Sequence, residues 1–216
     1  MLTLRGDRYS GGFVAQRRKR LLDTDGILDA SLACIDETSR LTMADLAERL
    51  GVSASSIYHH LRGRVAIIEA LRERLAAAID PPPLDGSDWA DQIRRWMRAY
   101  RQALAEHPNL IPLLNEQTMT GGSVLLAYER VAALLRQVGV PAREVVLWIG
   151  VLDAYALGSA LDLVAPDEVW RVEREDLPAL RAAIGAAPTG RLRADEAFDL
   201  GLGALLAGLR QRLSPG

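Results

Sequence analysis

Cysteine is almost absent from this sequence, because Cys34 is the only one among 216 residues. A single cysteine excludes an intramolecular disulfide and a zinc cluster built from cysteines. The N-terminal residues also lack the apolar run of a signal peptide, since Arg5, Asp7 and Arg8 interrupt them. We therefore expect a globular protein of the cytoplasm, with neither a cofactor nor a metal site.

Alternating strand patterns and internal repeats are also missing, whereas apolar residues recur at helical spacing along most of the chain. Apolar residues make up 49% of the sequence, which is enough for a substantial core. These features predict an all-α protein. The prolines of "DPPPLDGSD" cannot continue a helix, so we expect one domain over 23–80 and a second over 81–216.

A strong net charge is absent as well, because the chain carries 26 basic and 28 acidic side chains. The charge is nevertheless uneven: residues 1–79 have 12 basic and 10 acidic side chains, a net charge of +2, and the remainder has 14 and 18, a net charge of −4. The first part contains a basic run formed by Arg17, Arg18, Lys19 and Arg20. In a flexible arm over 1–22, this run could contact the phosphates of DNA or could simply be a solvated tail.

The stretch "LTMADLAERLGVSASSIYHHL" predicts two short helices joined by a sharp turn. Thr42 is a suitable N-cap for the first helix, and Gly51 can adopt the positive φ that ends it. Ser53 is a suitable N-cap for the second helix. A helix over about 25–38 precedes this pair, and another follows it. This arrangement is typical of a helix-turn-helix motif, whose second helix lies in the major groove of DNA.

The outer face of that second helix carries hydroxyl, phenol and imidazole groups, which can bind phosphates and base edges. The residues expected to contact DNA on this face are Ser53, Ser55, Ser56, Tyr58, His59 and His60. A metal site is disfavoured, because adjacent histidines on a helix diverge by about 100° and no acidic residue or cysteine has a suitable spacing. No catalytic triad is indicated either. The alternative is that Tyr58 packs inside the domain and the histidines are solvated.

The second domain is predicted to contain helices separated by glycine and proline signals. Ser87 is expected to cap the first of them. The expected elements are a helix from 87 to about 107, a shorter one over 109–118, one after 122, helices over 141–164 and 194–213, and a mobile connection with one short helix over 165–193. In the last helix, Gly201, Ala204 and Gly208 would allow another helix to approach closely.

The longest apolar run, "VVLWIGVLDAYALGSALDLVA" from Val145, is about as long as a bilayer is thick. Asp153 lies at its middle, where an aspartate costs roughly 2.5 to 3.5 kcal/mol in a membrane. We therefore expect a buried helix of a soluble protein and no membrane contact. Because this helix is apolar on nearly every face, more than the core of one chain is needed to cover it.

Several side chains of the second domain combine an apolar body with a polar group and could line a ligand pocket. These candidates are Trp96, Tyr100, His107, Gln117, Tyr128, Trp148, Asp153 and Tyr155. Each could instead be an ordinary core residue. Asp153 requires a partner, which could be another helix, a second subunit or a cationic group of a ligand. An all-α enzyme that uses Asp153, Tyr155 and His107 as acid and base groups is an alternative from another functional class.

"LTMADLAERLGVSASSIYHHLRGRVAIIEAL" resembles the DNA-binding domain of the TetR family of bacterial transcriptional regulators. "HPNLIPLL" and "FDLGLGALLAGL" resemble the ligand-binding and dimerisation part of its tetracycline-repressor-like branch. The resemblance implies a homodimer formed through the helices over 141–164 and 194–213. It also implies a repressor that a small-molecule effector releases from a palindromic operator in double-stranded DNA. A regulator without an effector, and a module that binds an acidic protein instead of DNA, are the alternatives.

The resemblance also implies roles for individual residues. Thr42 would hold the start of its helix near a phosphate, and Arg64 would contact the DNA backbone. In many relatives a basic or polar residue that reads a base follows the capping threonine, whereas this helix opens with Met43, Ala44 and Asp45, which puts base contacts from this helix in doubt. The sequence also departs from the family pattern at Ser39, where glycine is common, so the first helix is expected to end differently.

Overall fold

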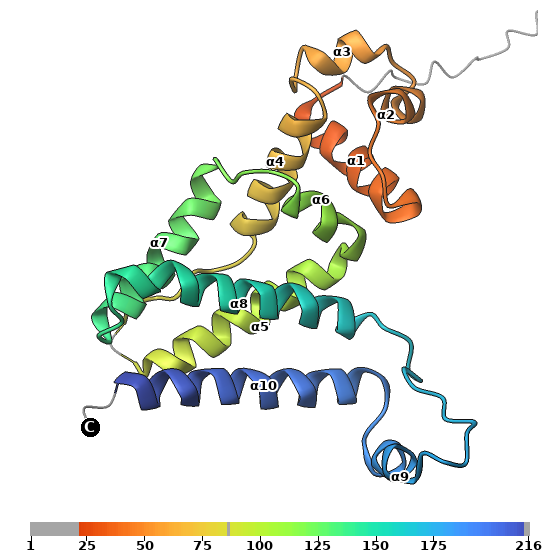
Figure 1. Cartoon of the computed structure of the whole chain (residues 1–216). Coiled ribbons are helices and arrows are strands. Elements are labelled where there is room, and N and C mark those ends of the chain that lie inside the picture. Colours follow the sequence, from red (N-terminus) through yellow and green to blue (C-terminus); the bar gives the residue numbers. More distant parts are fainter. Residues whose placement is uncertain (1–21, 86, 214–216) are drawn as a thin grey trace, which may run out of the picture.

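The computed structural model describes residues 22–85 and 87–213, and every regular element in these ranges is a helix. The all-α prediction is therefore confirmed (Figure 1). The predicted basic run at 17–20 lies outside the described residues. The elements are α1 (Thr24–Thr38), α2 (Met43–Leu50), α3 (Ala54–Tyr58), α4 (Arg64–Ala77), α5 (Trp89–Glu106), the 3-10 helix η1 (Pro108–Leu110), α6 (Ile111–Asn115), α7 (Gly122–Gln137), α8 (Ala142–Leu163), α9 (Pro178–Ala186) and α10 (Gly190–Leu213).

Helices α1 to α4 form a small bundle at one end of the molecule (Figure 1). Local caps set the bounds of the two central helices. Thr42 accepts a hydrogen bond from the Asp45 amide at 3.1 Å, and Gly51 ends α2 with a φ of 65°. Ser53 accepts one from the Ser56 amide at 3.3 Å and so begins α3. The predicted sequence of helix, sharp turn and helix is confirmed.

Ser39 ends α1 in a conformation that glycine adopts more easily. Its φ is 56°, in the left-handed region, and its amide donates a hydrogen bond to the carbonyl of Ile35 at 2.8 Å. A side chain in this region costs roughly 1 to 2 kcal/mol. The expectation of a different helix end is therefore wrong: α1 ends in a glycine-type cap although serine occupies the position.

Helix α4 connects the small bundle to the rest of the chain. Its residues Ile67, Ile68 and Leu71 are buried in the same continuous core as Ile27 of α1 and Met97 of α5. The helix packs against α1 in the first bundle and against α6 and α7 in the second half. Any displacement of α4 therefore changes the packing on both sides.

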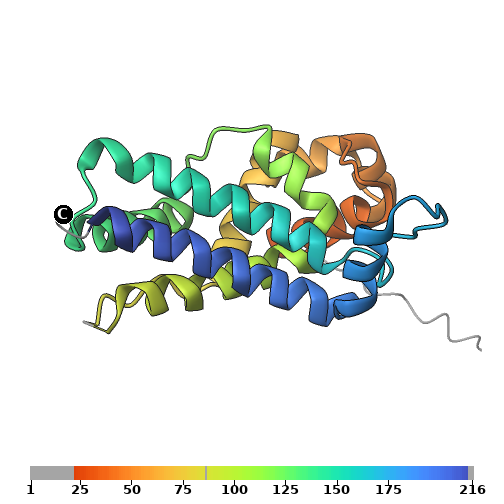
Figure 2. The ribbon, with the colours of Figure 1, turned by 60° about the horizontal axis from the view of Figure 1, so that its bottom comes forward.

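The second half is built around α5, α7, α8 and α10 (Figures 1 and 2). Its helices differ from the predicted ones in three details. Asp88, and not Ser87, caps α5, because the Asp88 carboxylate accepts hydrogen bonds from two amides of the first turn. The helix expected over 109–118 is shorter, because the chain forms η1 first and α6 ends at Asn115. The last helix begins at Gly190 and not at Ala194.

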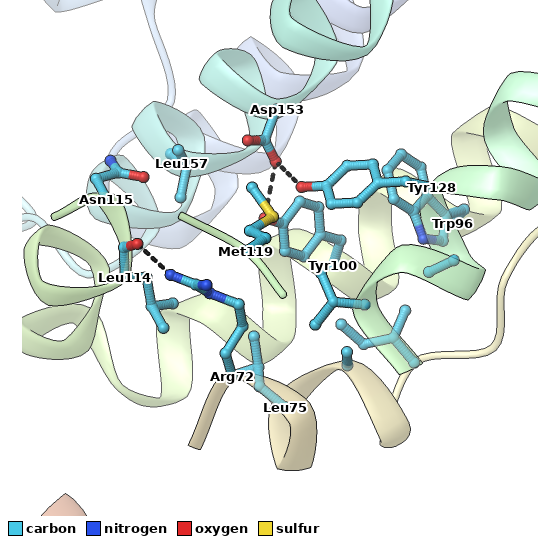
Figure 3. Close-up of a pocket in the computed structure, with 14 residues that line it drawn as sticks. Arg72, Leu75, Trp96, Tyr100, Leu114, Asn115, Met119, Tyr128, Asp153 and Leu157 are labelled. Atoms are coloured by element: carbon cyan, nitrogen blue, oxygen red, sulfur yellow. Dashed lines mark hydrogen bonds between the residues drawn. The ribbon is translucent and has the colours of Figure 1, made fainter. Parts of the chain in front are cut away.

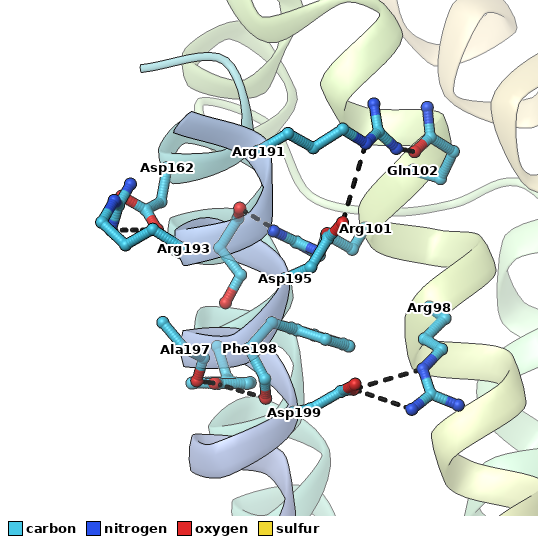
Figure 4. A network of polar contacts seen from close by, with 12 residues as sticks. Arg98, Arg101, Gln102, Asp162, Arg191, Arg193, Asp195, Ala197, Phe198 and Asp199 are labelled. Carbon is cyan, nitrogen blue, oxygen red and sulfur yellow. Dashed lines mark hydrogen bonds and ion pairs between the residues drawn. The ribbon is translucent and has the colours of Figure 1, made fainter. Parts of the chain in front are cut away.

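A polar network fixes α10 to α5, and Figure 4 shows its members. Arg101 of α5 is only 5% exposed, yet its guanidinium donates to Asp195 at 2.6 Å and to the carbonyl of Ser159 at 3.2 Å. The same guanidinium lies 4.6 Å from the centre of the Phe198 ring. This combination of ion pair and cation–π contact stabilises a buried charge.

Helix α8 is only partly covered by its own chain, as its apolarity on nearly every face predicts. It is long and apolar enough to cross a membrane by length and composition, and only 22% of its apolar window is buried within the chain. Val146 and Leu147 are 74% and 67% exposed, and Leu200 on α10 is 78% exposed. Figure 2 shows α8 and α10 side by side. The single chain therefore does not bury this helix, because its apolar residues point in more directions than the neighbouring helices cover.

Three small residues of α10 were predicted to allow a close helix approach, and Gly201 is the one at which α8 comes close. A Cβ at Gly201 would lie 2.2 Å from the Tyr155 hydroxyl, which donates a hydrogen bond to the Phe198 carbonyl at 2.9 Å. At Gly208, by contrast, a Cβ would meet no atom of another described helix within 4 Å. The connection before α10 contains the one short helix expected, α9, none of whose residues is buried.

Candidate DNA-binding surface and ligand pocket

The polar residues predicted to contact DNA lie together on the surface of α3 and the residues next to it. Ile57 is fully buried and faces the core, whereas Tyr58 is 50% exposed. His59 and His60 are exposed. A Cβ added at Gly63 would lie 3.3 Å from the Tyr58 ring, so this ring packs against the turn that precedes α4. Tyr58 therefore has features of both alternatives considered from the sequence. Its ring packs partly against the domain, and half of its surface is exposed where DNA could bind.

Three serine hydroxyls form a cluster where α3 begins. The Oγ atom of Ser53 lies 2.8 Å from that of Ser55 and 2.9 Å from that of Ser56. Ser53 and Ser55 are exposed, and Ser56 is half-buried. Hydroxyls placed at the N-terminal end of a recognition helix can bind phosphate oxygens.

Arg64 stands at the start of α4, where the bundle meets the second half. Its guanidinium pairs with the carboxylate of Glu116 at 2.9 Å, directly after α6. Both side chains are partly exposed, at 36% and 52%. A partly exposed pair is weak, so a DNA phosphate can compete with Glu116 for this guanidinium. Thr42, the other residue expected near phosphate, is exposed.

A pocket lies where α4, α5, α6, α7 and α8 meet (Figure 3). Its cavity of about 60 Å³ is small, and most of its lining is apolar. The lining residues are Arg72, Leu75, Ala76, Ile79, Trp96, Tyr100, Leu114, Asn115, Met119, Val124, Ala127, Tyr128, Asp153 and Leu157. Four of the eight residues predicted from the sequence for a ligand site are therefore brought together here: Trp96, Tyr100, Tyr128 and Asp153.

Asp153 projects from α8 between two tyrosines. Its Oδ1 atom accepts hydrogen bonds from the hydroxyls of Tyr100 and Tyr128, each at 2.8 Å (Figure 3). Burial, and next the negative charge of Asp153, raise the pKa of both tyrosines above the ordinary value of 10.0. Both phenols therefore remain protonated at neutral pH and act as donors to the carboxylate. Tyr100 also stacks on Trp96, with ring centres 5.5 Å apart.

Arg72 is a charged residue of the pocket lining that was not predicted from the sequence. It is only 5% exposed, pairs with Glu69 at 2.6 Å and donates a hydrogen bond to the carbonyl of Leu114 at the end of α6. It also donates to the carbonyl of Gln117 at 3.4 Å. The available signal was its spacing on α4, four residues after Ile68 and three before Leu75, which places it on an apolar face where a charged residue needs partners.

The other four predicted pocket residues lie elsewhere. The ring of His107 lies 2.9 Å from Asp36 of α1, in a contact between the two halves. The side-chain amide of Gln117 is buried without a hydrogen-bond partner among the described residues, but it is not part of the cavity lining. Trp148 lies with Leu147 in the surface groove of α8, and Tyr155 bonds to α10. Helical periodicity predicts only which face of a helix is buried. It could not show which buried residues line the cavity and which contact another helix.

The described residues contain no group of three or more histidine, cysteine, aspartate or glutamate side chains that could hold a metal ion. Within that part of the chain, neither His59 nor His60 forms an ion pair with an acidic residue.

Family models match this chain in two places. Residues 27–71 match the model for bacterial regulatory proteins of the tetR family, and residues 82–213 match the tetracyclin repressor-like C-terminal domain. The second match alone covers more than half of the 216 residues. The chain belongs to the TetR family.

Individual relatives agree with this family. The chain is 28% identical over 183 residues to an HTH-type transcriptional regulator of Saccharopolyspora erythraea, covering 84% of this chain and 73% of that protein. It is 28% identical over 201 residues to the tetracycline repressor protein class A from transposon 1721 of Escherichia coli, covering 88% and 92%. The Streptomyces coelicolor TetR family protein ActR, solved with actinorhodin, has the same fold, with a TM-score of 0.72 at 21% identity over 90% and 99% of the chains.

This TetR-family chain is a DNA-binding helix-turn-helix transcriptional regulator. Regulators of the family bind DNA and small-molecule effectors and typically act as dimers. The first two relatives named above are a transcriptional regulator and a tetracycline repressor, which disfavours the all-α enzyme considered from the sequence.

Proposed function

We propose that this chain is a homodimeric repressor that binds a palindromic operator through α3 and leaves it when a small molecule enters the pocket. The observation that carries the proposal is the position of α4. This helix belongs to the small bundle that bears α3, and it also supplies Arg72, Leu75 and Ala76 to the pocket wall. One helix therefore connects the two sites.

The size of the cavity supports coupling between the sites. Ligand pockets usually measure about 300 to 1,000 Å³, whereas this cavity has about 60 Å³. An effector therefore has to move the wall in order to bind. Because α4 forms a large part of that wall, the bound state has a different position of α4 and of the attached α3. A ligand that binds this state more tightly shifts the population away from the DNA-binding one.

The dimer is proposed to form through α8 and α10. Val146 and Leu147 of α8 and Leu200 of α10 expose most of their surface on adjacent helices. Exposed apolar faces of this extent mark interaction surfaces. A two-fold axis through them would present two copies of α3, and reading adjacent major grooves requires a separation of about 34 to 36 Å. A palindromic operator is the partner that this symmetry fits.

The experiment that tests the proposal is selection of bound duplexes from a random pool by the purified protein. We expect an enriched palindrome, bound at roughly 10⁻⁸ to 10⁻¹¹ M. Tyr58→Ala should weaken this binding, and Arg64→Ala should lower the slope of log K against log salt by about 1. Arg74→Ala is the matched control, since Arg74 is on the same helix and pairs with Asp29.

Three outcomes would contradict parts of the proposal. Enrichment of no sequence beyond non-specific binding would refute operator recognition by this chain. Retention of full operator affinity in Tyr58→Ala or Arg64→Ala would remove that residue from the DNA surface. Release of the operator that no small molecule induces would favour a regulator without an effector.

A further inference from the structure

We propose that the pocket selects organic cations: effectors with an apolar or aromatic body and a protonated amine that pairs with Asp153. This inference rests on the proposed function, because it assigns a chemical class to the effector of that pocket. It follows from a difference between the two charged residues of the pocket wall: Arg72 has an ion-pair partner, whereas Asp153 has none among the described residues.

The positive charge of the wall is already compensated. Arg72 pairs with Glu69 at 2.6 Å, and its remaining donors reach the carbonyls of Leu114 and Gln117. An anionic ligand would have to displace these partners, which come from α4, the end of α6 and the residues after it. The pocket therefore offers no free cation to a ligand.

The negative charge of the wall is not compensated by a cation. Among the described residues no ion pair involves Asp153, and its two hydrogen bonds, from Tyr100 and Tyr128, both end on Oδ1. In that part of the chain, Oδ2 accepts no hydrogen bond. A carboxylate in an apolar wall is stabilised by an opposite charge together with hydrogen bonds. A ligand ammonium group supplies both to Oδ2.

The rest of the lining fits an organic cation with a flat or aliphatic body. The stacked rings of Trp96 and Tyr100 form one side of the pocket, and Ile79 and Leu157 provide aliphatic contacts. Figure 3 shows the rings of Tyr100 and Tyr128 beside the Asp153 carboxylate. Aromatic faces attract cations as well as apolar groups. A protonated amine beside Asp153 would therefore meet aromatic rings and a carboxylate together.

The present cavity matches the head group and not the whole ligand. A volume of about 60 Å³ corresponds to about two waters at 30 Å³ each, which is enough for an ammonium group. Met119, in the connection before α7, is 38% exposed and also lines the cavity, so the wall reaches solvent there. The body of the ligand would occupy space gained by moving this wall.

The test uses matched pairs of probes that differ only in charge: tryptamine with N-acetyltryptamine, and 2-naphthylmethylamine with its N-acetyl derivative. Binding to the full chain at neutral pH is measured by calorimetry and by the shift in Tm. We expect the amine of each pair to bind at least about tenfold more tightly than the amide, as one ion pair in a partly buried site provides. Asp153→Asn should abolish this preference, and Asp153→Glu should keep part of it.

Asp162→Asn is the matched control, because Asp162 is on the same helix and pairs with Arg193 outside the pocket. This variant should keep the preference for the amine. The proposal is overturned if amides bind as tightly as amines, if no amine binds, or if Asp153→Asn keeps the preference. A neutral probe that releases a selected operator would overturn the cation class and leave the proposed function intact. Amine binding by a protein that selects no operator would refute the proposed function and leave the cation class intact.

Discussion

Replacing Arg72 by methionine should destabilise the protein far more than the same change at Arg74, two positions along α4. Arg72 is 5% exposed, and its loss leaves the Leu114 carbonyl without its donor and Glu69 without its cation. Breaking a buried ion pair costs about 3 to 5 kcal/mol. Glu69 is 19% exposed and keeps a hydrogen bond from the Thr120 amide at 3.0 Å, which places the cost at the lower end, about 3 to 4 kcal/mol.

The change at Arg74 should cost little. Its partner is Asp29, and the two side chains are 47% and 62% exposed, so solvent screens the pair. Such pairs contribute about 0 to 1 kcal/mol. Methionine preserves the apolar stem and the helix propensity at both positions. The difference between the variants therefore isolates the buried contacts of Arg72.

The assay is urea or thermal unfolding at one fixed protein concentration, because association changes the apparent stability of a dimer. A cost of about 3 to 4 kcal/mol corresponds to a loss of roughly 6 to 16 °C in Tm for a chain of this size. Adding Glu69→Gln to Arg72→Met should recover part of the loss, because it removes the unpaired charge. Equal stability of Arg72→Met and Arg74→Met would refute the reasoning.

Two further predictions concern the pocket and the exposed helices. Because the pKa of Tyr100 and of Tyr128 is raised above 10.0, the unfolded chain loses these protons first as the pH rises, so the stability present below about pH 10 should decline above it. A tyrosinate absorbance titration checks this, and ordinary titration of both residues in the folded protein would contradict it. Leu147→Glu or Leu200→Glu should convert a dimer into monomers, as measured by analytical ultracentrifugation, whereas Leu125→Glu on α7, 48% exposed, should not. Unchanged association in both α8 and α10 variants would place the interface elsewhere.

Local signals in the sequence were sufficient to predict where the two central helices of the first bundle begin and end. The hydroxyls of Thr42 and Ser53 and the free φ of Gly51 act on amides and torsions within a few residues. These interactions are therefore readable without the fold. Where two adjacent residues offered the same signal, as Ser87 and Asp88 do, only the structure could decide which one caps α5.

The pocket could be predicted only in part. The sequence identified Asp153 as a charge in need of a partner, and the structure supplies Tyr100 and Tyr128 from two other helices. Tyr155 has the same amphipathic character, but it points to a different side of α8, where its hydroxyl bonds to α10. Arg72 looked like one more basic residue of a helix until the carbonyl of Leu114, more than forty residues away, was brought to it.

The sequence by itself determined the helices, the turn that carries α3 and the family, because caps, periodicity and short motifs depend on neighbouring residues. The tertiary structure alone decided that α4 is shared by the DNA-binding bundle and the pocket, and which residues of α8 and α10 remain exposed in one chain. The physical reason is that burial and charge compensation depend on atoms from distant segments. No local pattern specifies which of those segments will meet.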